Sequence, residues 1–213
     1  MNAVRRLPTK ASGIKTRYES WARLVSDLLS PPVIWGVIAF AVAAYRTDNP
    51  NDAFIWGLLY TVIVCVFPAA YVGWMVKRGV ISDVHMANRS ERYRPFVVTC
   101  ICTVFAWAML SVLGAPEALP LYALFSLVQV VIMLAITLFW QISFHTMSIS
   151  GAVTIAGILY GASTFFTLSP LIGLVALARL NLHRHTRAQV VAGITLGGVM
   201  TYILYRLTQP FWV

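Results

Sequence analysis

Three short polar stretches in an otherwise apolar chain carry arginines, histidines and a serine at spacings that could do chemistry. Arginine holds phosphate oxygens through paired hydrogen bonds. Two histidines that titrate near neutral pH can supply a nucleophile and a general acid without a metal ion. The combination predicts an anion site in which histidines are placed for phosphoryl transfer. The stretches are Arg89-Ser-Glu-Arg92-Tyr-Arg94-Pro95, Ser143-Phe-His145 and Arg179-x5-His185-x3-Gln189.

The elements that must position these stretches are predicted to be membrane-spanning helices. Of the 213 residues, 59% are hydrophobic and 11% are charged, whereas about a quarter of the residues of a soluble domain are charged. Several apolar runs approach the roughly 20 residues that cross a bilayer as a helix. We therefore expect an all-α, polytopic transmembrane helical bundle of six or seven spans. The expected spans cover residues 28–45, 53–76, 96–115, 118–140, 145–163, 167–182 and 188–207.

The order of the spans predicts that all three polar stretches emerge on one side of the membrane, because two spans separate each stretch from the next. That side also carries the four histidines and all Lys and Arg residues except Arg46 and Arg206. Basic residues are retained on the cytoplasmic side, so we expect the N-terminus and the site to be cytoplasmic, in the cell inner membrane. The net charge of +9 is explained in this way, without a nucleic-acid partner.

The chain is expected to divide into two parts. Residues 1–27 form a basic, partly amphipathic cytoplasmic segment, which either lies in the headgroup region or leads into the first span. Residues 28–213 form the transmembrane domain. Within that domain, Gly193-x3-Gly197 is a small-x3-small pattern that favours close helix contact. We interpret it first as packing within the chain and second as a homodimer contact.

Taken together, the three stretches resemble the signature of the type 2 phosphatidic acid phosphatase superfamily of membrane lipid phosphatases. That signature is a Lys/Arg stretch ending in Arg-Pro, then Pro-Ser-Gly-His, then Ser-Arg-x5-His-x3-Asp. The resemblance covers residues 77–197. The matching segments are Arg94-Pro95, Ile142-Ser143-Phe144-His145 and Ala178-Arg179-x5-His185-x3-Gln189.

The resemblance implies a role for each motif residue. His185 would be the nucleophile that forms a phosphohistidine, His145 would be the general acid, and Gln189 would orient His185. The implied reaction is hydrolysis of a phosphomonoester or diphosphate on a membrane lipid, of phosphatidate or polyprenyl-phosphate type, with no metal ion or other cofactor. Residues 28–213 would then be a lipid-phosphatase-like domain. The implied phosphate-binding residues are Arg94, Ser143 and Arg179, with Arg89 or Arg92 in place of the family's first lysine.

Departures from the signature leave a second function open. Gln189 stands where the family has Asp, and it can accept a hydrogen bond from His185 but cannot stabilise an imidazolium by charge. Phe144 replaces Gly, and the residue seven before Arg94, where the family has its lysine, is Ala. The alternative is a catalytically impaired protein that binds or transports a lipid phosphate on the same scaffold.

Two further chemistries are weaker interpretations of the same residues. A zinc site could draw on Asp83, His85, His183 and His185, but a His-x-His pair on a helix projects its rings about 200° apart. A prenyl or alcohol-phosphate transferase would need clusters of aspartates to hold magnesium and diphosphate. Asp83 is the only aspartate near the three stretches, so the sequence offers no such cluster there.

Overall fold

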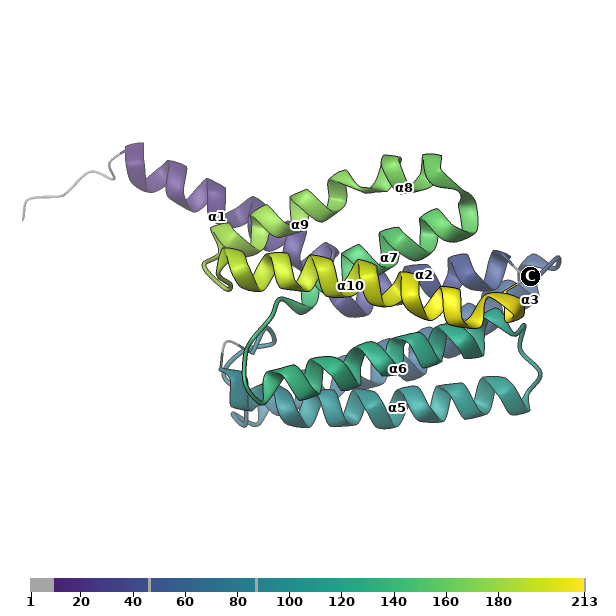
Figure 1. The fold of residues 1–213 in the computed structure, drawn as a ribbon. Helices are drawn as coiled ribbons and strands as arrows, with labels where there is room; N and C mark the ends of the chain where they lie inside the picture. Colours follow the sequence, from purple (N-terminus) through teal and green to yellow (C-terminus); the bar gives the residue numbers. More distant parts are fainter. Residues whose placement is uncertain (1–9, 46, 87, 213) are drawn as a thin grey trace, which may run out of the picture.

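The computed structural model describes residues 10–45, 47–86 and 88–212, and these are helical with no strand among them (Figure 1). The predicted segment 1–27 therefore lies partly outside the described residues. The elements in chain order are α1 (Lys10–Leu28), α2 (Pro31–Tyr45), α3 (Pro50–Tyr60), the π-helical turn η1 (Thr61–Val66), α4 (Phe67–Lys77), the 3-10 turn η2 (Arg89–Arg92), α5 (Tyr93–Val112), α6 (Ala118–Thr137), α7 (Phe144–Tyr160), α8 (Ala162–Leu168), α9 (Pro170–Asn181), α10 (Arg187–Thr208) and the 3-10 turn η3 (Gln209–Phe211).

The predicted all-α transmembrane bundle is confirmed. Five helical stretches are long and apolar enough to cross a membrane, and a sixth span forms if the last part of α1 and α2, bent by 41°, are counted together. The helix α7 lies where the span 145–163 is expected. It has 17 residues and is shorter than each of these stretches. The five stretches are Pro50–Lys77, Arg89–Val112, Ala118–Thr137, Ala162–Asn181 and Arg187–Phe211.

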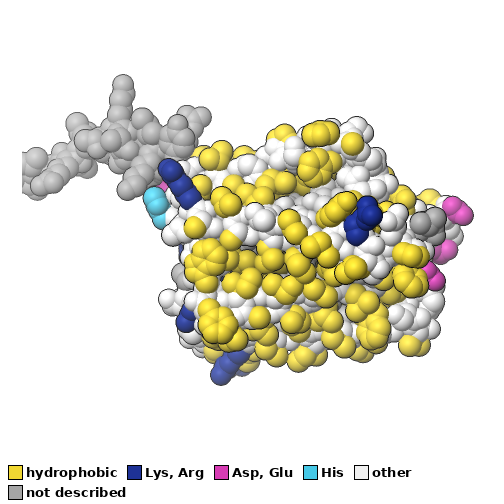
Figure 2. Space-filling view, in the orientation of Figure 1, with side chains coloured by type: hydrophobic (Ala, Val, Ile, Leu, Met, Phe, Trp, Pro, Cys, Tyr) yellow, Lys and Arg dark blue, Asp and Glu magenta, His cyan; other side chains and the backbone are white. Residues whose placement is uncertain are grey.

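The outer surface of the bundle is apolar, as a lipid-facing surface must be. Figure 2 shows a broad band of hydrophobic side chains between two polar ends. Phe139, for example, is 84% exposed, and such exposure over a whole band marks a surface that does not face water. In this view most of the visible basic side chains lie at the left end of the band, and acidic side chains lie at its right end (Figure 2).

The helix α7 lies at the centre of the bundle and contacts α2, α8, α9 and α10. Its closest neighbour is α10, which approaches through two glycines. A Cβ atom at Gly197 would clash with the carbonyl oxygen of Met147, and one at Gly193 would lie 2.6 Å from the carbonyl oxygen of Ser143. The expectation that the Gly193-x3-Gly197 pattern packs helices within the chain is thus confirmed.

All three polar stretches lie at one end of the bundle, as the order of the spans predicts. The loop before α5, the loop before α7 and the loop between α9 and α10 meet at the left of Figure 1, beside the junction of α1 and α2. This arrangement brings side chains that are up to 153 residues apart in sequence into contact, as the hydrogen bond between Arg179 and Ser26 shows.

Candidate active site

A cavity of about 320 Å³ opens at this end of the bundle and collects basic side chains from five segments of the chain, together with the carboxylate of Asp27. We call its basic residues the basic wall and its apolar residues the apolar wall. The basic wall comprises His85 from the loop before η2, Arg92 from η2, His145 from the first turn of α7, Arg179 from the last turn of α9, and His185 from the loop before α10. The apolar wall comprises Pro31, Pro32, Pro68, Ala69, Val72, Phe96 and Phe144.

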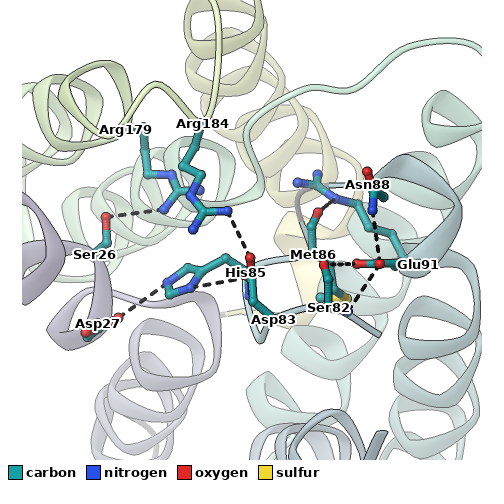
Figure 3. A network of polar contacts seen from close by, with 11 residues as sticks. Ser26, Asp27, Ser82, Asp83, His85, Met86, Asn88, Glu91, Arg179 and Arg184 are labelled. Atoms are coloured by element: carbon teal, nitrogen blue, oxygen red, sulfur yellow. Dashed lines mark hydrogen bonds and ion pairs between the residues drawn. The ribbon is translucent and has the colours of Figure 1, made fainter. Parts of the chain in front are cut away.

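Two arginines of the cavity are buried without an acidic partner. Arg92 is 6% exposed and Arg179 is 1% exposed. Arg92 Nε donates to the carbonyl oxygen of Met86 at 3.0 Å. Arg179 Nη1 donates to Ser26 Oγ at 3.3 Å, as Figure 3 shows. No carboxylate of the described chain forms an ion pair with either guanidinium, and the buried Nε of Arg179 has no partner. Buried charges are normally paired, so this cavity is suited to an anion.

His185 is held by a hydrogen bond to the first turn of the helix that follows it. Its Nδ1 lies 3.2 Å from Gln189 Oε1, and the same oxygen accepts the backbone N–H of Thr186 at 3.0 Å. The Thr186 hydroxyl in turn accepts the N–H of Gln189, which completes a capping box at the start of α10. Because Gln189 Oε1 can only accept, the proton of a neutral His185 lies on Nδ1 and the lone pair on Nε2.

His185 is neutral at physiological pH. Burial lowers its pKa to about 3, helped by the positive charges of Arg179 and Arg92, whereas the bond to Gln189 acts in the opposite direction. A neutral imidazole with a free Nε2 lone pair is the form that a nucleophile requires.

His145 is oriented by the helix α1 rather than by a side chain of its own stretch. The backbone of Ser26 lies close to its ring, and its Nε2 is buried without a partner. Both histidines that the sequence singles out thus line the cavity. His185 is anchored through Nδ1, and Nε2 of His145 has no partner.

The predicted site residues fall into two groups. His145, His185, Arg92 and Arg179 line one cavity, with Gln189 behind His185. Three others do not line it: Arg89, Arg94 and Ser143.

The local structure around Arg89, Arg94 and Ser143 explains why these residues do not line the cavity. Arg89 and Arg94 are exposed, and Arg94 lies two residues after Arg92 where helix α5 begins, so the two side chains project about 200° apart. Ser143 is fully buried, and its hydroxyl accepts the backbone N–H of Thr146 as the N-cap of α7.

The structure adds His85 to the site, which the sequence suggested only as a metal ligand. Its Nε2 lies 3.3 Å from Asp27 Oδ1, and its backbone N–H donates to Asp83 Oδ1 at 2.6 Å. Asp83 is also bonded to Arg184 at 3.0 Å (Figure 3). The sequence did hold a signal for His85: it precedes Arg92 by seven residues, the spacing that the resemblance requires between its first lysine and arginine. No signal of this kind marks Asp27.

The alternative zinc set does not assemble. Within the ranges that the structure describes, no three His, Cys, Asp or Glu side chains are grouped so that they could hold one metal ion. His183 is exposed, in a left-handed backbone conformation with φ of 52°, and it does not line the cavity that contains His185.

Comparison with known proteins adds no relative: no family model, no curated protein and no solved structure matches this chain.

Proposed function

We propose that this protein is a membrane lipid phosphatase, a divergent member of the type 2 phosphatidic acid phosphatase superfamily. It would hydrolyse a phosphomonoester or diphosphate on a membrane lipid, of phosphatidate or polyprenyl-phosphate type, through a phosphohistidine at His185 and without a metal ion. One observation carries the proposal. Two buried arginines without acidic partners line the same cavity as His185, whose Nδ1 is bonded to Gln189, and His145, whose buried Nε2 has no partner.

The chemistry follows from those positions. The Arg92 and Arg179 guanidiniums bind the phosphate oxygens and neutralise their charge. Nε2 of His185 attacks phosphorus while the bond from phosphorus to the lipid oxygen breaks, and protonated His145 gives its Nε2 proton to the departing alkoxide. Water then attacks the phosphohistidine, returning a proton to His145 and the electron pair of the P–N bond to His185.

The two walls of the cavity favour an amphiphilic substrate. The phosphate fits the basic wall, and a lipid chain fits the apolar wall formed by α2, α4 and α5. The Phe144 ring packs edge-on against both Trp35 and Phe96, with ring centroids 5.4 Å from each. Since this end of the bundle also carries most of the basic residues, the site would face the cytoplasm from an inner membrane, with a phosphorylated membrane lipid as its partner.

The test is phosphate release by the detergent-purified protein from a panel of lipid phosphates, with EDTA present, beside His185→Asn. Asn retains a polar side chain but cannot form the phosphohistidine. The proposal expects release by the wild type, none by the variant, and an acid-labile phosphoenzyme trapped only on the wild type. If no lipid is hydrolysed while both proteins bind the panel equally, the protein binds or transports lipid phosphates instead.

A further inference from the structure

The cavity reaches the lipid-facing surface of the bundle through its apolar wall. Ala69 of α4 lines the cavity and is itself exposed. Its neighbours Phe67 and Ala70 are exposed as well, and Phe67, at 58%, belongs to the apolar band that faces lipid. The first turn of α2 contributes Pro31 and Pro32 to the same wall. The cavity is therefore open toward the bilayer between α2 and α4.

The packing of α2 and α4 explains this opening. The helix α2 packs against α3 and η1, whereas α4 packs against η1 and α5. The two helices thus share η1 as a neighbour and part on the site side of that turn, where the cavity lies between them.

The π-helical turn η1 also decides which face of α4 meets the cavity. The N–H of Phe67 bonds to the carbonyl oxygen of Val62, five residues back, so the turn accommodates one residue more than an α-helix would. One residue corresponds to about 100° around a helix axis. The extra residue sets the phase of α4 that brings Pro68 and Ala69 to the cavity.

The side chains at the opening cannot move aside. They are prolines and an alanine, which have no rotamers to lose when a ligand binds. The opening is therefore preformed, and a lipid chain enters it at little entropic cost. For the same reason these side chains cannot rotate to widen it, so the opening has a fixed width. The residues are Pro31, Pro32, Pro68 and Ala69.

The cavity is small for a lipid. Its volume of about 320 Å³ lies at the low end of the roughly 300–1,000 Å³ that is typical of ligand pockets. With a phosphate held by Arg92 and Arg179, the remaining space admits the first part of one chain, and the rest of that chain must lie in the bilayer. A diacyl phosphate branches at its glycerol, close to the phosphate. Both of its chains would have to pass the opening together.

We propose that the site selects lipid phosphates with a single chain, and that Ala69 sets this selection. The inference rests on the proposed function, which supplies the position of the phosphate. A single-chain lipid phosphate, of alkyl or polyprenyl type, places its phosphate on the basic wall and extends past Ala69 into the bilayer. A two-chain phosphate of phosphatidate type would need room at the same rigid opening for a second chain.

The experiment compares two substrate classes and two neighbouring alanines of the full-length protein in detergent micelles. The substrates are alkyl phosphates of increasing length and diacylglycerol phosphates of matched chain lengths. The variants are Ala69→Trp and its matched control Ala70→Trp. Both alanines are exposed on α4, but Ala70 does not line the cavity. Ala69→Leu provides a smaller obstruction, and thermal unfolding checks that each variant is folded.

We expect the wild type to hydrolyse alkyl phosphates with a kcat/KM about tenfold or more above that for the matched diacyl phosphates. Ala69→Trp should lower kcat/KM for alkyl phosphates by about tenfold, with a loss that grows with chain length. Ala69→Leu should lose less, and Ala70→Trp should match the wild type. Diacyl phosphates hydrolysed as fast as alkyl phosphates, or equal losses in the two Trp variants, would overturn the selection while the phosphatase survives.

A wild type that hydrolyses neither class would overturn the phosphatase, and binding then decides the selection. The same lipids are added before thermal unfolding, because a ligand that binds the folded protein raises its unfolding midpoint. The selection expects a rise with alkyl phosphates that exceeds the rise with diacyl phosphates and is lost in Ala69→Trp but not in Ala70→Trp. Equal rises with both classes, or no rise with either, would overturn it.

Discussion

The imidazole of His185 and the side-chain amide of Gln189 come from residues four apart in sequence and share a hydrogen bond of 3.2 Å between Nδ1 and Oε1. The same amide oxygen caps the start of α10 through the N–H of Thr186. One side chain thus fixes both the tautomer of the candidate nucleophile and the position of the helix that follows it. A glutamine can do this because the required acceptor is an oxygen, whether or not that oxygen is charged.

Replacing Gln189 by Glu tests how much the absence of a negative charge at this position slows formation of the phosphoenzyme. Glu has the same length, so it can keep both hydrogen bonds and add a negative charge that stabilises the imidazolium character of His185 in the transition state. We expect Gln189→Glu to form the phosphoenzyme about tenfold faster, measured by rapid quench with a lipid phosphate. Gln189→Met, which keeps the length but removes the acceptor, should be slower than the wild type. Equal rates in all three proteins would show that the bond does not control the nucleophile.

Conservative substitution of the basic residues separates the cavity arginines from the exposed ones. Lys lacks the planar fork of Arg, so Arg92→Lys should weaken inhibition by inorganic vanadate about tenfold or more. Arg94→Lys should leave inhibition unchanged, because Arg94 is exposed and does not line the cavity. The reverse result, with Arg94 sensitive and Arg92 tolerant, would restore the assignment that the Arg94-Pro95 motif implies.

The fold class and the grouping of the three stretches were predictable, because long apolar runs and the alternation of sides depend on sequence order alone. The orientation of individual arginines was not. A motif match identified Arg94, but the helical phase at the start of α5 decides which side chain faces inward, and it selects Arg92. That phase is set by the packing of α5 against α6 and α4.

The contribution of α1 could not be predicted either. Ser26 and Asp27 lie in a segment that reads as a basic, interfacial helix, yet they touch Arg179, His145 and His85. The contact depends on the bend between α1 and α2 and on the packing of α1 against α9. Neither leaves a periodic signal in the sequence.

Acid should destabilise the protein partly through His185. Its pKa is about 3 in the folded protein and about 6.5 when unfolded, so the unfolded chain binds the proton that the folded chain refuses. Stability therefore falls as the pH falls through this window, by about 1.5 kcal/mol between pH 6.5 and about pH 5. Thermal unfolding in detergent should show a smaller loss for His185→Asn than for the wild type, because all other titrating groups are shared. Parallel pH profiles would mean that His185 is not buried in its neutral form.

The contact between α7 and α10 can be tested with two glycines that differ only in their surroundings. An added methyl group at Gly197 would clash with the Met147 carbonyl oxygen, whereas nothing lies within 4 Å of the same atom at Gly173 in α9. Gly197→Ala should cost about 1–3 kcal/mol, since the clash is with backbone that cannot rotate away. Gly173→Ala should be neutral or stabilising by up to about 1 kcal/mol.

The same pair of variants links packing to the site. His145 begins α7 and His185 precedes α10, so forcing the two helices apart at Gly197 also separates the two histidines. We expect Gly197→Ala to lose phosphate release at temperatures well below its unfolding midpoint, and Gly173→Ala to retain it. If Gly197→Ala were destabilised but fully active at low temperature, the spacing of α7 and α10 would not set the geometry of the site.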